Sequence, residues 1–257
     1  MLTEAEYNGL WEDNFAPKFG GILIPDYDQY NIRENMFQDY LDIYRGFNSR
    51  NIRLIQPNPW YYEHPFFDNN GNLKLDKVPK IKYILIAEAA PNIQININQI
   101  NQIKYIYNTN LMGGQYITAP LNAFGIIANN TIDRLLLLAS KGALIIDLFP
   151  FALEYTNLRD IIINNKIDAN FWQSNENPYS MNNRLHQLKN ENLASEKIIG
   201  SFIAPATISI NLSNFIYISY LSHHGINFDW RPIEFACVGQ SRSNTPNSQR
   251  IKNGLGL

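Results

Sequence analysis

The chain has 257 residues, a formal net charge of −2 and a single cysteine. This length allows one large α/β domain or two small ones, and we expect one domain over residues 1–257. One cysteine excludes an internal disulfide, a four-cysteine zinc site and a cysteine-ligated iron–sulfur cluster. The four histidines show no paired metal-binding spacing, so we expect no metal and no other cofactor.

The weak acidity of the chain argues against strong non-specific binding to nucleic acids, which needs a basic surface. A local basic segment remains, because Arg231, Arg242, Arg250 and Lys252 stand against a single acid, Glu234, beyond residue 230. Near the N-terminus, acidic residues stand where a signal peptide would be basic and apolar, and no apolar run is long enough to span a membrane. We therefore expect a cytoplasmic protein with no membrane partner.

The first 79 residues are expected to form an acidic and aromatic extension that includes one covering helix. Aromatic residues before position 31 would pack on the flank of the domain. Apolar residues recur at helical spacing over 33–47, which predicts an amphipathic helix against a sheet face. The segment 57–80 is rich in proline, asparagine and aromatic residues and predicts a loop.

The segment 80–91 is the clearest candidate for a core strand. Its apolar run is too short for a free-standing helix and is bounded by prolines, which is typical of a strand buried on both faces of a parallel sheet. Glu88 follows this run, where the strand should give way to a loop. Ligands of open α/β sheets bind beyond the carboxyl ends of the strands, so Glu88 is a candidate catalytic residue. The alternative is a carboxylate that caps the next helix.

A second strand of the same kind is predicted at 143–146, and it also ends on a carboxylate, Asp147. A helix is expected before it, from Thr131 to a stop at Gly142. We expect Asp147 and Glu88 to converge on one cavity, because neighbouring parallel strands end at the same edge of a sheet. Asp147 could equally be a cap or turn residue.

The remaining elements complete the pattern. A helix is expected after Pro120 and another over 180–193, followed by a strand at 197–205, a helix over about 207–221 and a last strand at 233–239. Strands that alternate with helices predict an α/β fold, a three-layer α/β/α arrangement around a central, mainly parallel sheet.

The order of these parts resembles the uracil-DNA glycosylase superfamily. Its members have a central parallel sheet, a Gly-Glu-Ala-Pro-Gly or Gly-Gln-Asp-Pro-Tyr motif after an early strand, and a His-Pro-Ser motif after the last strand. Here 87–91 (Ala-Glu-Ala-Ala-Pro) looks like a variant of the first motif, and 145–150 looks like the middle strand that carries a base-recognising residue. Residues 242–250 stand where the second motif belongs. The glycosylase-like core would be residues 80–257.

The resemblance implies a DNA glycosylase that cleaves the N-glycosidic bond of uracil or a modified base. In that reaction positive charge builds on the sugar and negative charge on the departing base. Glu88 and Asp147 are the candidate catalytic residues, with Glu88 stabilising the sugar cation and activating a water. The partner would be nucleic acid, DNA rather than RNA, or a nucleotide. The alternative is a catalytically inactive module of the same fold that binds a nucleotide, a nucleic acid or a protein.

The base would be held out of the stack against an aromatic ring, with polar groups reading its edge. Phe149 or Tyr107 would supply the ring, and Asp147 or Asn108 would read the edge. In the second motif Arg242, Ser243 and Asn244 would hold phosphate, with Arg242 supplying charge in place of the family's histidine. The alternatives are core packing for Phe149 and a solvated helix for the C-terminal segment.

Overall fold

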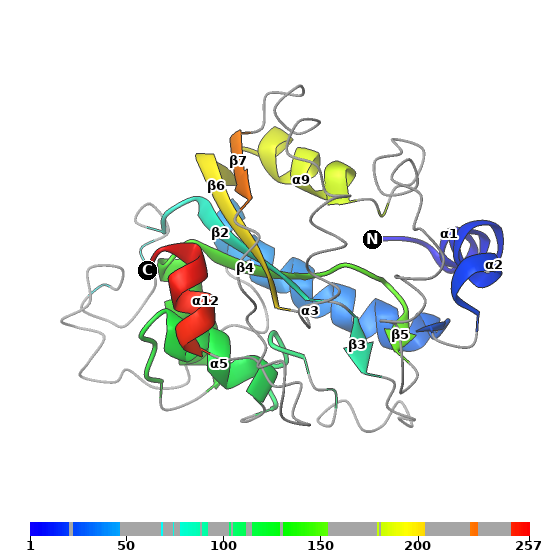
Figure 1. Cartoon of the computed structure of the whole chain (residues 1–257), viewed down its shortest axis with the longest axis horizontal. Coiled ribbons are helices and arrows are strands. Elements are labelled where there is room, and N and C mark those ends of the chain that lie inside the picture. Colours follow the sequence, from blue (N-terminus) through cyan, green and yellow to red (C-terminus); the bar gives the residue numbers. More distant parts are fainter. Residues whose placement is uncertain are drawn as a thin grey trace.

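The computed structural model describes residues 1–20, 23–46, 68, 74, 78–87, 89–91, 103, 105–111, 115–128, 131–153, 179, 181–203, 227–230 and 248–257. Figure 1 shows this part of the chain as a twisted sheet with helices packed around it. The predicted segments 57–67, 207–221 and 233–239 lie outside the described residues.

The main sheet has four strands in the order β4-β2-β6-β7, and every neighbouring pair is parallel. The strands are β2 (Ile81–Ala87), β4 (Ala143–Asp147), β6 (Ala194–Ile203) and β7 (Asn227–Trp230). In β4 the first four residues are buried, and in β2 the central run from Ile84 to Ile86 is buried. The predicted parallel α/β sheet, with β2 and β4 as buried neighbouring strands, is confirmed.

Helices lie against both faces of this sheet (Figure 1). The helical elements of the described residues are α1 (Glu4–Leu10), the π-helical turn η1 (Trp11–Phe15), α2 (Ala16–Phe19), α3 (Tyr27–Arg45), α5 (Gln115–Ala123), α6 (Thr131–Ser140), α9 (Met181–Asn190) and α12 (Ser248–Leu255). Of these, α1 and α2 lie beside the sheet, at the right of the view in Figure 1. Tyr83 packs on Phe124, directly after α5. Side chains alternate between the faces of a strand, so Ile146 faces the other way, toward α3 and α9.

Helix α3 begins earlier than the sequence pattern predicted. The side chain of Asp26 accepts a hydrogen bond from the backbone N–H of Gln29 at 2.9 Å and so caps the helix at its start. At the other end Gly46 takes a left-handed conformation with φ of 81°, which suits glycine and stops the helix. The apolar periodicity missed the first turns of α3, although Tyr30 there is buried in the core.

Within the described residues, β4 and β7 are the two edge strands of this sheet, and side chains satisfy the backbone of β4 along its outer edge. The hydroxyls of Tyr40 and Tyr44, both on α3, donate to the carbonyl of Ala143 at 3.0 and 2.9 Å. The hydroxyl of Tyr107 accepts from the N–H of Ile145 at 2.7 Å and donates to its carbonyl at 2.9 Å. A buried strand edge needs such partners, because unpaired backbone groups away from water are costly.

A second, small sheet follows the main one and has the order β1-β5-β3. It contains β1 (Leu23–Ile24), β5 (Ala152–Leu153) and β3 (Ala90–Pro91). In β5, Ala152 pairs in parallel with Ala90 of β3. The chain that leaves β2 therefore meets the chain that leaves β4 a second time, just beyond the main sheet.

Several predicted boundaries were wrong. Helix α5 contains Pro120 instead of beginning after it, because Ile117 and Leu121 on either side bury the same apolar face. Helix α9 ends at Asn190, three residues before the predicted end. Strand β6 begins at Ala194, also earlier than predicted, because the backbone of Ala194 pairs with Ile81 of β2.

The C-terminal segment is also different from the solvated helix that was weighed as an alternative. Helix α12 packs on α5 and β6, at the front of the view in Figure 1. Ile251 and Leu255 are each only 1% exposed. Their spacing of four residues gives α12 one apolar face, which explains why it docks on the domain.

Candidate functional site

The candidate site lies at the carboxyl ends of β2 and β4, where the sequence predicted it. Ala87 pairs with Asp147, and the N–H of Leu148 donates to the carbonyl of Ala87 at 2.8 Å. The prediction that two neighbouring strands each lead to an acid is therefore confirmed. Glu88 itself lies outside the described residues, so the meeting of its carboxylate with that of Asp147 stays a prediction.

The carboxylate of Asp147 is held by an arginine from α3. Its Oδ2 lies 3.2 Å from Nη1 of Arg33, and the two side chains are 13% and 5% exposed. The same guanidinium donates to the carbonyls of Gln29 at 3.3 Å and Pro150 at 3.4 Å. Arg33 thus joins α3 to the end of β4 and to the loop that follows it.

The protonation of Asp147 reflects two opposing influences. Burial raises the pKa of this carboxyl, whereas the positive charges of Arg33 and Arg184 lower it, and the net result is a pKa above the ordinary value. Carboxyls with raised pKa values are common at functional sites, although structural ion pairs also shift them. Asp147 is therefore easier to protonate than an exposed aspartate.

A second arginine, Arg184 of α9, completes this cluster. Its Nη1 donates to the backbone carbonyl of Asp147. Its guanidinium also lies over two rings, 4.7 Å from the centroid of Tyr179 and 5.5 Å from that of Phe37. Burial works to lower the pKa of Arg184, but the acidic groups around it, Tyr179 and Glu34 first, outweigh burial and raise the pKa. The cation is fixed in position and stays charged.

Arg184 borders a hollow between α3 and α9. The hollow has a volume of about 180 Å³. Glu34, Gln38 and Gln187 contribute polar groups to its wall, and Ile146 of β4 contributes to its apolar floor. Ligand pockets for drug-sized molecules measure roughly 300–1,000 Å³, so this hollow suits something smaller.

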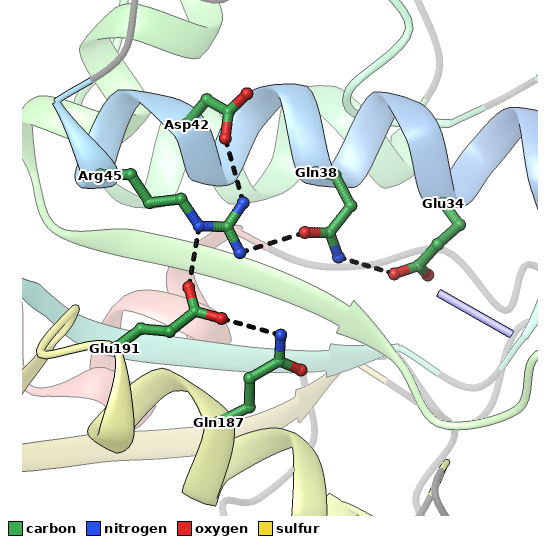
Figure 2. A network of polar contacts seen from close by, with 6 residues as sticks. All are labelled: Glu34, Gln38, Asp42, Arg45, Gln187 and Glu191. Carbon is green, nitrogen blue, oxygen red and sulfur yellow. Dashed lines mark hydrogen bonds and ion pairs between the residues drawn. The ribbon is translucent and has the colours of Figure 1, made fainter.

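The acidic side of the hollow is held by a chain of polar contacts, which Figure 2 shows. Oε1 of Glu34 accepts from Gln38 at 2.8 Å, and the Gln38 side-chain carbonyl accepts from Arg45 at 3.1 Å. Arg45 also bonds Glu191, just after α9, at 2.8 Å, and Glu191 accepts from Gln187 at 2.9 Å. This network ties α3 to α9 and fixes the position of Glu34.

Tyr107 and Asn108, expected to line the crevice and bind a base, are instead core residues. Tyr107 is 2% exposed and stacks on Tyr40 with ring centroids 4.4 Å apart. Asn108 is 0% exposed; its amide donates to the carbonyl of Ile103 at 2.8 Å and its oxygen accepts from Asn110 at 3.0 Å. The segment is buried because Tyr107 pairs with the backbone along the outer edge of β4. Nothing in the sequence around Tyr107 shows that this edge needs a partner.

Phe149 is also in the core, which is the alternative weighed from the sequence. It is 0% exposed and meets Phe15 edge to face at 6.0 Å. Phe151 packs on Phe15 at 4.6 Å and on Tyr7 at 5.1 Å. These contacts dock the N-terminal helices on the loop after β4, which confirms that the early aromatic residues pack on the flank of the domain.

The remaining candidates, Arg242, Ser243 and Asn244, lie outside the described residues. Sequence reasoning missed three charged residues that matter to the site: Arg33, Glu34 and Arg184. Arg33 had a signal, because it precedes Phe37 by four residues and so lies on the buried stripe of its helix. A charge on such a stripe requires a partner, and Asp147 is that partner.

Within the described part of the chain, no three histidine, cysteine, aspartate or glutamate side chains converge to hold a metal ion. None of the helices described is both long enough and apolar enough to cross a bilayer. Comparison with protein-family models, curated proteins and solved structures finds no significant match to this chain.

Proposed function

We propose that this protein is a DNA glycosylase-like hydrolase with the three-layer fold of the uracil-DNA glycosylase superfamily, and that it cleaves the N-glycosidic bond of uracil or a modified base. The observation that carries the proposal is the pairing of Ala87 with Asp147. It puts Asp147 beside the residue that precedes Glu88, at the carboxyl edge of a parallel sheet, where α/β proteins bind their ligands.

The second strand pairing supports the same proposal. Ala90, two residues after Glu88, pairs with Ala152 of the chain that carries Asp147. The backbone is therefore fixed on both sides of Glu88 against the same neighbouring segment. Catalytic groups work best when the fold holds them in place before the substrate arrives.

In the proposed reaction, the bond between the sugar carbon and the base nitrogen breaks and the electron pair leaves with the base. Glu88 stabilises the sugar cation and takes a proton from the water whose oxygen bonds the sugar carbon. Asp147, whose pKa is raised, gives a proton to the departing base. Tyr107 and Phe149 play structural parts, and contacts to the DNA are assigned to Arg242, Ser243 and Asn244.

A second candidate function, a non-catalytic module that binds a nucleotide, nucleic acid or protein, is favoured by a different observation. The Asp147 carboxylate is already engaged by Arg33, and the rings expected to hold a base are buried. Ion pairs of this kind often serve structure alone.

Two conservative variants test the proposal. The parent chain should release base from uracil-containing or base-modified DNA, detected as abasic sites, and Glu88→Gln should lower that rate by about 100-fold or more. Asp147→Asn should also lose base release while keeping its circular dichroism spectrum. Glu196→Gln, an exposed change on β6, is the matched control and should be as active as the parent.

The outcomes separate the two functions. Base release that survives both Glu88→Gln and Asp147→Asn would show that the catalytic roles are assigned wrongly. DNA binding without abasic product on any substrate would favour the binding module.

A further inference from the structure

The hollow between α3 and α9 is lined by two charges of opposite sign, a buried one on Glu34 and a half-buried one on Arg184, which attract each other without forming an ion pair. Within the described residues, ion pairs join Arg33 to Asp147 and Arg45 to Asp42 and Glu191, and none joins Glu34 to Arg184. Both of these side chains line the hollow. Charges withdrawn from water gain from partners at hydrogen-bond distance, so a ligand between these two side chains could bond both.

Each charge retains bonding capacity. The described hydrogen bond of Glu34 uses Oε1, on Gln38, and that of Arg184 uses Nη1, on the Asp147 carbonyl. A carboxylate has a second acceptor oxygen and a guanidinium has further donors in a planar fork. The fork suits a carboxylate bound through two parallel hydrogen bonds.

Both charges are also held in place before any ligand binds. Glu34 is fixed through Gln38 and Arg45, as Figure 2 shows. Arg184 is fixed by the Asp147 carbonyl and by the rings of Tyr179 and Phe37. Preorganised groups lose little entropy on binding, which favours a specific small ligand over a loosely held solvent cluster.

The size of the hollow limits the ligand. Its volume of about 180 Å³ corresponds to roughly six waters at about 30 Å³ each. Phe37, Leu41 and Leu188 give it apolar walls, which suit a short aliphatic group. Charge limits the ligand too, because Glu34 and Arg184 face the same hollow with opposite signs, so a ligand that carries both signs can meet each of them. The third charged residue of the lining, Glu6, is exposed and bonded to Thr3.

We propose that this hollow is a binding site for a small zwitterion, a free α-amino acid with a short side chain, whose carboxylate bonds Arg184 and whose ammonium group bonds Glu34. The site is separate from the carboxyl edge that bears Glu88, and binding there does not depend on glycosylase activity. Arg184 contacts both sites, because it lines the hollow and also donates a hydrogen bond to the backbone carbonyl of Asp147.

Calorimetric titration of the full chain, without DNA, tests the proposal. Glycine, alanine, serine and proline are the probes, and at least one should bind with a Kd below about 10 mM. For that amino acid, the N-acetyl derivative lacks the cation and the carboxamide derivative lacks the anion. Each derivative should bind at least about ten-fold more weakly, because it leaves one of the two charges unmatched. Tryptophan, which exceeds the volume, should not bind.

Variants locate the binding to these residues. Glu34→Gln keeps an oxygen for Gln38 but removes the charge, and it should weaken binding by about ten-fold or more. Glu12→Gln, an exposed change on η1, is the control and should bind as the parent does. The proposal is overturned if none of the four amino acids binds more tightly than about 10 mM. It is also overturned if the blocked derivatives bind as well as the free form, a readout that holds even if Glu34→Gln fails to fold.

Discussion

Strand β4 has two contrasting surroundings. Along its free edge, Tyr40, Tyr44 and Tyr107 pair with the backbone of Ala143 and Ile145. On the face toward α3 and α9, Ile146 borders a hollow lined by Glu34 and Arg184, which attract each other but form no ion pair among the described residues. The edge is a closed structural feature, and the face carries the hollow for which we propose a ligand.

The difference teaches how to tell a structural polar group from a functional one. Tyr107 was expected to stack on a base, yet its hydroxyl is bonded to the backbone of β4 and its ring is buried. Glu34 and Arg184, which carry no sequence motif, keep hydrogen-bonding capacity at an accessible surface. Unused bonding capacity, and not residue type or nearness to a strand end, marks the candidate ligand site.

The largest expected effect concerns Tyr107. Tyr107→Phe removes the partner of both the N–H and the carbonyl of Ile145, and we expect it to lower the free energy of unfolding by about 3 kcal/mol. Burial raises the pKa of Tyr107 far above its usual value, so the hydroxyl keeps its proton and can donate. Urea unfolding of parent and variant measures the loss.

Tyr83→Phe is the matched control, because Tyr83 lies in β2 and its ring packs on Phe124. It should cost about 0.5 kcal/mol or less. If Tyr107→Phe lowers the free energy of unfolding no more than this control does, the side-chain bonds along the edge do not stabilise β4. The edge and the face of β4 would then not differ in the way described above.

A smaller effect is expected from the two tyrosines that share one acceptor. Tyr40→Phe and Tyr44→Phe should each cost about 0.5 kcal/mol, since the remaining hydroxyl still bonds the Ala143 carbonyl. The double variant should cost about 2 kcal/mol, more than the sum, because the carbonyl then has neither partner. Simple additivity in urea unfolding would show that the two hydroxyls act independently.

The smallest expected effect is a pH dependence of the free energy of unfolding that comes from Asp147, at the end of β4. The folded-state pKa of Asp147 is raised by burial, so its contribution to stability is full below the unfolded value of about 3.9 and is lost as pH rises through the folded value. Asp147→Asn lacks this loss. Relative to the parent, the variant should therefore gain stability between acid and neutral pH, as followed by thermal unfolding at several pH values. A constant difference would mean that Arg33 fully compensates the buried charge.

The sequence predicted what depends on local pattern. Strands β2 and β4 were recognisable as short apolar runs between prolines or a glycine, and Gly142, with φ of 67°, does end the turn after α6. Their adjacency followed from the rules for parallel sheets. Both predictions need only neighbouring residues and general topology.

What the sequence could not predict depends on distant partners. Arg33 and Asp147 are 114 residues apart, and Tyr107 and Ile145 are 38 apart. Nothing near Tyr107 shows that its hydroxyl serves a strand edge. Strand β7 was missed because Asn227–Trp230 mixes polar and aromatic residues and gains its place by pairing with β6.

The two connections that leave the main sheet have unequal lengths, and this has a mechanical consequence. Two residues separate Ala87 from Ala90, while four separate their partners Asp147 and Ala152. The longer connection carries Phe149 and Phe151 into contact with the N-terminal helices. Those helices consequently hold the connection from β4 to β5 in place. A substitution at Phe15 that weakens these ring contacts would therefore shift residues 148–151 without changing a residue of β2 or β4.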